Sequence, residues 1–372
     1  MKVLIAGDYV PCERVATALE SGDYSCLEEV FFLIQNVEYS IVNLECPVVT
    51  TEAKPIYKAG PNLKCSERAV ECLHQTGFHC LTLANNHFLD YGSSGVEDTL
   101  IACEKYGISH VGGGRNSEEA AKIHYFHEEG HTLAIINCCE HEYSIATSTS
   151  PGSNPLNIVK QFYAIREARK NADKVLVIVH GGYEMCQLPL PRMVETYRFF
   201  IDAGADAVVN HHQHCFSAYE VWNGKPIFYG LGNFCFDRKG QENTIWNEGY
   251  MVTLDLSNDS FLIHPYVQCS DEPKVKLLKQ DAYNNRLLQL NEFVQDEQRL
   301  KKEIELFFDS KKHTHSRIFE PILNSKWLSL IRRGWVPSLI SKERILQADN
   351  YVRCESLRDG LLYYLSDKEN KI

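Results

Sequence analysis

Short apolar runs alternate with amphipathic stretches from residue 3 to about residue 215. The apolar runs predict β-strands at 3–6, 40–44, 80–84, 109–111, 133–137, 175–179 and 207–209. The stretches between them predict helices at 66–76, 96–106, 158–170 and 193–203. A glycine directly follows three of these helices, which is typical of a helix end. Strands that alternate with helices in this way predict an α/β fold.

Hairpin signals add antiparallel strands to this pattern. Apolar or alternating runs flank turns at Glu129-Gly130, at Asn223-Gly224 and at 257–260. We therefore expect an α/β (α+β) fold with two sheets inside and helices outside. Beyond Asp281 the pattern is helical and charged, most clearly at 291–308. Apolar residues within 327–335 also have helical spacing and are expected to pack against the rest of the chain.

Four polar clusters follow predicted strands. They are Gly7-Asp8, Asn85-Asn86-His87, His180-Gly181-Gly182 and His211-His212-Gln213-His214. Strand ends that face one edge of a sheet bring distant residues to one point. Imidazole, carboxylate and amide groups gathered there are suitable ligands for a first-row transition metal. The clusters therefore predict a metal-centred hydrolytic site.

Each cluster taken alone has an ordinary structural explanation. Asp8 is placed to cap a helix that begins near Pro11, and a single His180 is compatible with a hydrogen-bonded core residue. His212 and His214 are more indicative, because alternate residues of an extended segment point to the same side. Four clusters at the ends of predicted strands favour a metal site over four separate structural roles.

Composition limits the class of protein. The chain has 372 residues, with 44% hydrophobic and 23% charged residues, as in an ordinary globular protein of about two domains. Its net charge of -11 argues against general nucleic-acid binding. Residues 1–269 carry 19 Lys+Arg and 33 Asp+Glu, whereas 270–372 carry 19 and 16. This change in charge predicts a catalytic domain at 1–269 and a helical appendage at 270–372.

The chain shows no signal for secretion or membrane insertion. The first apolar run stops at Asp8, short of the roughly 7–15 residues of a signal peptide core. No segment approaches the ~20 apolar residues that cross a bilayer, so we expect no membrane span. The 14 cysteines contain no Cys-x-x-Cys pair and several lie in apolar runs. Buried, reduced thiols and a cytoplasmic location are therefore expected.

Five segments resemble the bacterial capsule-synthesis CapA family, of the poly-γ-glutamate synthesis type. They are Val42–Glu45, the run Leu-Thr-Leu-Ala-Asn-Asn-His-Phe-Leu-Asp-Tyr-Gly at 81–92, His180–Glu184, His212–His214 and Tyr229–Phe234. The resemblance covers roughly residues 1–240. That family is similar to the calcineurin-like metallophosphoesterases, so the resemblance implies a four-layer fold, a two-sheet β-sandwich flanked by helices.

The resemblance also implies roles for individual residues. The expected metal ligands are Asp8, Glu45, Asn86, His180, His212 and His214. His87 and Asp90 are expected to be catalytic, with His87 acting on the substrate. The expected substrate-binding residues are Asn43, Asn85, Glu184 and Asn233. The mixed nitrogen and oxygen ligands suit one or two ions of Mn, Fe or Zn.

The chain departs from the phosphoesterase pattern at several positions. Val10 stands where that pattern has a histidine, and Glu45 replaces a bridging aspartate. Asn210-His211 and Gln213 stand where the capsule family often has Gly and Pro. One of the two metal positions is therefore expected to be weak or empty.

The expected activity is metal-assisted hydrolysis of a phosphoester or a γ-linked peptide bond. The substrate would be a small molecule or an anionic polymer, and capsule-synthesis proteins would be the partners. An alternative is a non-catalytic component of a capsule assembly machine that keeps the fold and one ion. A nuclease is disfavoured by the acidic charge of residues 1–269.

Overall fold

The larger of two facing sheets has the N-terminal strand near its middle. The computed structural model describes residues 1–50, 52–316, 333 and 341–369. The strands of this eight-stranded sheet are β16 (Val275–Leu277), β15 (Ser260–Gln268), β14 (Glu248–Asp255), β1 (Lys2–Val10), β2 (Tyr39–Leu44), β3 (Cys80–Thr82) and β4 (Ser109–Val111), in this order, with β13 (Asn233–Phe236) paired to β1. Strands β1 to β4 are parallel, while β14, β15 and β16 add antiparallel pairs.

The second sheet has six strands. Their order is β11 (Tyr219–Trp222), β12 (Lys225–Phe228), β10 (Ala207–His211), β9 (Lys174–His180), β7 (His131–Cys139) and β6 (His124–Glu128). Strands β7, β9, β10 and β12 are parallel, and the hairpins β6–β7 and β11–β12 form its two edges. A small two-stranded sheet joins β5 (Gly113–Gly114) to β8 (Gly152–Ser153).

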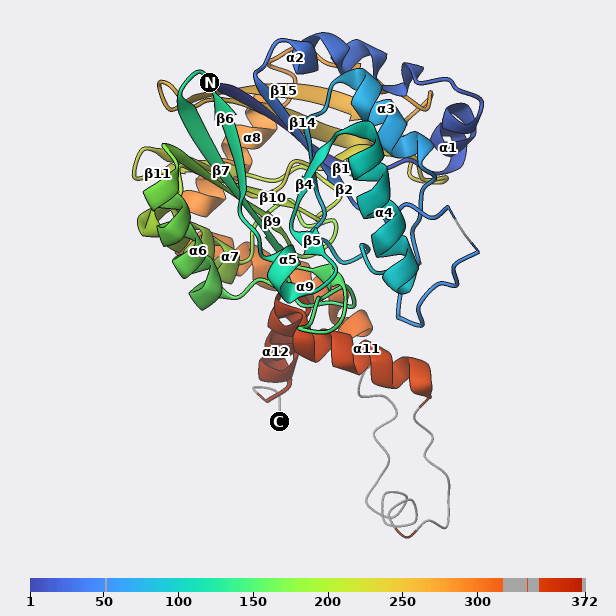
Figure 1. Ribbon diagram of the computed structural model, residues 1–372. Helices are drawn as coiled ribbons and strands as arrows, with labels where there is room; N and C mark the ends of the chain where they lie inside the picture. The colour runs from blue at the N-terminus through green and yellow to red at the C-terminus, as the bar shows by residue number, and fades with distance from the viewer. Residues whose placement is uncertain (51, 317–332, 334–340, 370–372) are drawn as a thin grey trace.

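Helices cover the outer face of each sheet (Figure 1). Helices α1 (Glu13–Glu20), α3 (Arg68–Thr76) and α4 (Gly92–Tyr106) contribute to the core outside the first sheet. Helices α6 (Ile158–Asn171), α7 (Pro191–Ala203) and α9 (Glu297–Ser316) contribute to the core outside the second. Further helical elements are η1 (Ser25–Val30), α2 (Phe31–Gln35), α5 (Ser117–Ala120), η2 (Ile245–Asn247) and α8 (Asn284–Gln295). The expected four-layer arrangement of two sheets flanked by helices is confirmed.

The strands are continuous apolar runs because both of their faces are covered. In β1, Val3 and Ile5 lie in the core between the sheets, whereas Leu4 and Ala6 lie in the core under the helices. Strand β9 divides its residues between cores in the same way. This alternation fixes which residues of each strand can reach the gap between the two sheets.

Three local features differ from the sequence-based expectation. Strand β1 does not end at Asp8 but continues to Val10 through an irregularity in its pairing with β2. The helix expected at 291–308 is divided into α8 and α9, because Asp296 is extended and its side chain accepts hydrogen bonds from the first turn of α9. A helix does begin near Pro11, at Glu13, but Asp8 does not cap it, and the helical elements within residues 25–35 had no prediction.

The chain after residue 270 first continues the main fold. Strand β16 pairs with β15, and Asn291 of α8 accepts a hydrogen bond of 2.8 Å from the backbone of Tyr219 in β11. Helices α11 (Lys342–Arg353) and α12 (Glu355–Glu369) follow. The division of the chain at residue 270 stays a prediction, and the helical spacing within 327–335 lies outside the described residues, apart from position 333.

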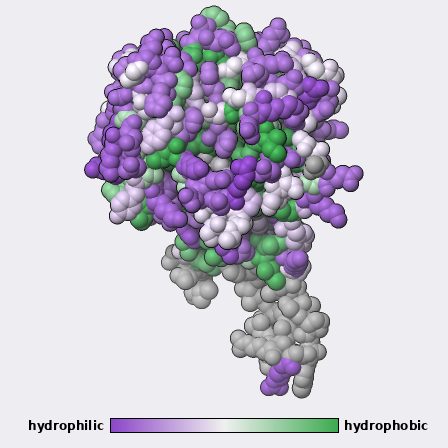
Figure 2. All heavy atoms as spheres, viewed as in Figure 1, coloured by the Kyte–Doolittle hydropathy of each residue, from purple (hydrophilic) through white to green (hydrophobic). Residues whose placement is uncertain are grey.

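The molecular surface and the thiols are as the composition suggests. The face in Figure 2 is largely hydrophilic. Thirteen of the fourteen cysteines are buried and Cys12 is partly buried. In the part of the chain that the structure describes, no helix is both long enough and apolar enough to cross a membrane.

Candidate metal centre

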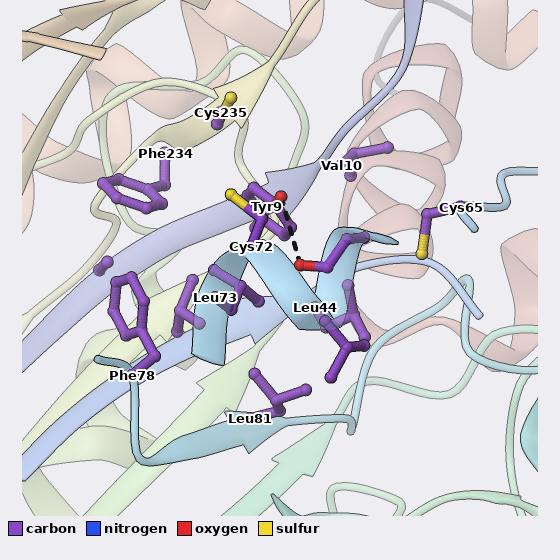
Figure 3. Packing of buried hydrophobic residues seen from close by; sticks show 14 of the residues in the cluster. Tyr9, Val10, Leu44, Cys65, Cys72, Leu73, Phe78, Leu81, Phe234 and Cys235 are labelled. Atoms are coloured by element: carbon purple, nitrogen blue, oxygen red, sulfur yellow. Dashed lines mark hydrogen bonds between the residues drawn. The ribbon is translucent and has the colours of Figure 1, made fainter. Parts of the chain in front are cut away.

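The irregularity in β1 turns Asp8 toward the gap between the sheets. Gly7 has to lack a side chain here, because a Cβ atom would lie 1.9 Å from the carbonyl oxygen of Gly232. The backbone N–H of Asp8 donates to the same oxygen at 3.2 Å. The next residue, Tyr9, packs into the core under the helices and donates to the carbonyl of Ala69 (Figure 3). Asp8 is therefore held by backbone pairing on one side and core packing on the other.

Three residues from three different segments form a first group of possible ligands. The donor atoms of Glu45, His180 and His212 all lie within 4.8 Å of one another. His180 Nε2 is 3.4 Å from Glu45 Oε1 and 3.1 Å from His212 Nδ1. The amide oxygen of Asn86 lies 3.1 Å from the same His180 nitrogen. A carboxylate, an amide oxygen and two imidazoles thus surround one point.

A second group shares Glu45 with the first. Here the donor atoms of Asp8, Glu45 and His214 lie within 4.8 Å of one another. His214 Nδ1 is 3.9 Å from Asp8 Oδ2 and also 3.9 Å from Glu45 Oε2. The two oxygens of Glu45 therefore face different groups, which is the arrangement of a carboxylate that bridges two sites.

The environment of Glu45 favours either a proton or a cation at this carboxylate. Its side chain is completely buried, and among the described residues neither oxygen has a hydrogen-bond partner. Burial raises the pKa of this carboxyl group well above its ordinary range, and the carboxylates of Asp8 and Glu184 raise it further. A buried carboxylate without a donor is costly unless a positive charge compensates it. These donors fit a divalent transition metal.

The nearby imidazoles are in the protonation state that metal binding needs. Burial lowers the pKa of His180 well below its ordinary value, and the other histidines of the site lower it further. Burial also lowers the pKa of His214. Both rings are consequently neutral near pH 7, so that each retains a lone pair for a metal.

The two histidines after β10 converge for a reason different from the one expected. Strand β10 ends at His211, and His212 and His214 have φ values of 94° and 57°, so the segment is not extended. The expectation that strand alternation aligns the two rings is wrong. A strained turn brings them together, with ring centroids 6.0 Å apart. His211, which was not among the predicted site residues, is also buried, with Nδ1 3.6 Å from Asp8 Oδ1.

The three asparagines expected to bind substrate form hydrogen bonds to other site residues or to the residue next to one. Asn43 Nδ2 donates to Asp8 Oδ1 at 2.7 Å, and Asn233 Oδ1 lies 2.9 Å from His214 Nδ1. Asn85 Nδ2 donates to the carbonyl oxygen of Leu44 at 2.9 Å, just before Glu45. All three are buried, and none is among the described residues that line the pocket beside the centre.

His87 lies next to the centre with two charged neighbours. Its Nδ1 atom is 2.7 Å from Asp90 Oδ2 and 3.1 Å from the ammonium of Lys58, which also forms an ion pair with Asp90. Burial and Lys58 lower the pKa of His87 to about 4, although Asp90 acts in the opposite direction. His87 is therefore neutral near pH 7. Lys58 was not a candidate, because no feature of the sequence near it indicates a site.

A recess of about 250 Å³ adjoins the centre. Its polar lining includes Asn86, His87, His212 and Glu184 from the predicted set. Glu142 and Asn350 also line it and were not predicted. A larger groove of about 1030 Å³ lies between α7 and the end of α8, but it contains none of the candidate ligands. Of these two hollows, the smaller recess is therefore the one that contains candidate site residues.

Two curated relatives are named for capsule or PGA biosynthesis. The chain is 36% identical over 213 residues to the capsule biosynthesis protein CapA of Bacillus anthracis, covering 55% of this chain and 52% of that protein. It is 34% identical over 238 residues to the PGA biosynthesis protein CapA of Bacillus subtilis (strain 168), covering 63% and 62%. The matches thus span only about half to three-fifths of the length of these relatives.

One solved structure and one protein family also match this chain. The structure of 5'-nucleotidase from Candida albicans SC5314 is similar at 10% identity with a TM-score of 0.43, covering 70% of this chain and 50% of that one, which is too distant to assign an activity. The family described as bacterial capsule synthesis protein PGA_cap matches residues 2–238. Because that match covers more than half of the chain, the protein belongs to the PGA_cap family of bacterial capsule synthesis proteins.

Proposed function

We propose that this protein is a metal-dependent hydrolase that takes part in the synthesis of a capsule or poly-γ-glutamate-like polymer. The observation that carries the proposal is the position of Glu45, a buried carboxylate whose two oxygens face two groups of possible ligands. Such a group is costly in the folded state without a cation. The names of the curated relatives support the polymer context.

In this proposal the chain provides two positions for Mn, Fe or Zn. Glu45, Asn86, His180 and His212 would hold one ion, and Asp8, Glu45 and His214 the other. Such an ion supplies a Lewis acid and makes a water nucleophile available near neutral pH. Asn43 and Asn233 would act as positioning residues, because they hold Asp8 and His214.

His87 would handle a proton on the substrate side. With the Nδ1 proton donated to Asp90, the neutral ring can accept a proton at Nε2 and return it to the leaving group. Asp90 fixes the orientation of the ring, and Lys58 forms an ion pair with Asp90. The bond cleaved would be a phosphoester or an amide of a small molecule or anionic polymer, and other capsule-synthesis proteins would be its partners.

A second candidate is a non-catalytic subunit of a capsule assembly machine. Val10 favours it, because this fully buried apolar side chain stands where the phosphoesterase pattern has a histidine. The loss of that ligand would weaken one of the two positions.

Metal analysis combined with an activity assay distinguishes the two candidates. The purified full chain would be analysed for bound metals and then assayed with p-nitrophenyl phosphate and a γ-glutamyl amide. We expect at least one Mn, Fe or Zn per chain and metal-dependent hydrolysis of one substrate. Bound metal without hydrolysis of either would favour the non-catalytic subunit, and a metal-free protein after loading would contradict both.

A further inference from the structure

The loop after β7 is bound by the last two helices of the chain. The carboxylate of Glu140 accepts hydrogen bonds from the backbone N–H and the hydroxyl of Ser356, at 3.1 and 2.8 Å. His141 donates its backbone N–H to Glu355 at 2.9 Å, and its Nδ1 is 2.7 Å from the same carboxylate. Both partners lie in the first turn of α12, so this turn holds the beginning of the loop.

The next two loop residues contact α11. Glu142 accepts a hydrogen bond of 3.2 Å from the side chain of Asn350, and the hydroxyl of Tyr143 donates to the carbonyl of Leu346 at 3.1 Å. Four consecutive loop residues, 140–143, are therefore bonded to α11 and α12. Arg192 of α7 strengthens the junction, because its guanidinium binds Glu140 and also Asp359.

The same loop contacts the candidate centre on its other side. The backbone N–H of Glu140 donates to the carbonyl of His180 at 3.0 Å. A Cβ atom on Gly181 would lie 2.6 Å from the Glu140 side chain, so the loop and the His180 segment are in close contact. Ser144 accepts a hydrogen bond of 3.1 Å from the backbone of Leu89, close to His87. The loop thus joins the C-terminal helices to the segments that carry His180 and His87.

The C-terminal helices also form part of the recess itself. Asn350 of α11 and Leu357 of α12 line it together with His87 and His212. Its volume of about 250 Å³ is small compared with the roughly 300–1,000 Å³ of most ligand pockets. Both residues lie beyond position 238, where the family match ends. This wall therefore lies outside the region that the family match covers.

We propose that α11 and α12 form a fixed wall of the substrate recess and restrict it to a terminal group. The site then acts on a small ester or on the end of a chain, and not on a bond in the interior of a polymer. Asn350 is a positioning residue that directs the Glu142 carboxylate into the recess, and Leu357 limits the depth of the recess. The restriction on substrate rests on the proposed hydrolase function, whereas the fixed wall does not.

Amide hydrogen exchange of the full chain tests whether the wall is fixed, and the experiment needs no enzymatic activity. We expect slow exchange of the amide of His141 in the wild type and in Arg353→Ala, an exposed change on α11 that alters only a surface ion pair with Asp349. Glu355→Ala removes the acceptor of that amide and should accelerate exchange at 140–144. Fast exchange in the wild type, or the same rate in all three proteins, would contradict the proposal of a fixed wall.

Hydrolysis by the metal-loaded full chain tests the restriction. The probes are p-nitrophenyl phosphate, a terminal ester, and bis(p-nitrophenyl) phosphate, which carries a group on both sides of the phosphorus. We expect the wild type to prefer the first by about 10-fold or more, and Leu357→Ala to reduce this preference. Asn350→Ala should raise KM for the first by roughly 2- to 10-fold, the effect of one hydrogen bond, with unchanged metal content.

The outcomes separate the two proposals. Equal rates on both esters in the wild type, or a preference that Leu357→Ala leaves unchanged, would overturn the restriction while the hydrolase function stands. Hydrolysis of neither ester nor of the γ-glutamyl amide by metal-loaded protein would overturn the hydrolase function and the restriction together. The exchange experiment would then still decide whether the wall exists. Arg353→Ala is expected to match the wild type in every assay.

Discussion

His180 Nε2 lies 3.4 Å from Glu45 Oε1, and both side chains are buried. The imidazole is neutral at pH 7, because burial lowers its pKa, and it therefore cannot compensate the carboxylate. The pair is stable only with a proton on Glu45 or with a bound cation.

Substitution of Glu45 should have opposite effects on stability and on metal binding. Glu45→Gln removes the buried charge, so the free energy of unfolding of the metal-free protein should rise by about 1–3 kcal/mol. The same change should lower metal content strongly, because both groups lose their shared ligand. Urea denaturation and metal analysis measure the two effects, with the exposed Glu20→Gln as the control. A variant that keeps its full metal content would contradict the shared role.

His87 and His214 should differ in what their loss removes. His87→Ala should leave metal content nearly intact while activity falls by ~10²–10⁴-fold, as for a general acid–base residue. His214→Ala should instead weaken metal binding, because its Nδ1 atom lies beside Asp8 and Glu45. The exposed His131→Ala is the control for both. Equal metal loss in the two variants would show that His87 is a ligand.

Added metal should raise the thermal stability of the protein. A ligand that binds only the folded state stabilises it by about 2.7 kcal/mol at 100 times its dissociation constant. Titration of the metal-free chain with Mn or Zn should therefore increase Tm progressively, and a chelator should reverse the increase. Differential scanning calorimetry measures the change. An equal increase in His180→Ala would place the binding elsewhere.

The contact between His141 and Glu355 should weaken at alkaline pH. The hydrogen bond to the Glu355 carboxylate raises the pKa of His141 above its ordinary value, Glu140 adds to this effect, and Arg358 opposes it. A raised pKa in the folded state means that the stabilisation is present below about pH 6.5 and is lost as the pH rises through the folded pKa. Because the imidazole is partly exposed, the loss should be under ~1 kcal/mol.

Urea denaturation at pH 6 and pH 8.5 measures this loss. The wild type should lose more stability over this interval than His141→Gln, which keeps a hydrogen-bond donor but does not titrate. Parallel stability curves for the two proteins would contradict the prediction.

The sequence predicted much of the fold because its strands are covered on both faces. A run such as 175–179 is apolar throughout and ends at His180, so both the strand and the position of its polar residue could be predicted. Asp8 and the His212–His214 segment were placed at the same edge by the same reasoning. The split at Asp296 could not be predicted, since the helical periodicity on either side is nearly continuous.

The geometry of the site was less accessible from the sequence. The left-handed backbone of His212 and His214 has no signature in a pattern of apolar residues, and the expected strand alternation failed there. Glu142 and Asn350 are 208 positions apart, and nothing near either residue indicates that they meet. Contacts of this kind depend on how separate layers pack, which a local pattern does not encode.

The loop after β7 is synthesised long before helices α11 and α12, which bind it. His141 and Glu355 are 214 positions apart. At ~5–20 residues per second, roughly 10–40 s separate the appearance of these two residues at the ribosome. Every proposed ligand, from Asp8 to His214, has been synthesised before α12 exists. A nascent chain can therefore gather its metal ligands while the recess still lacks its last wall.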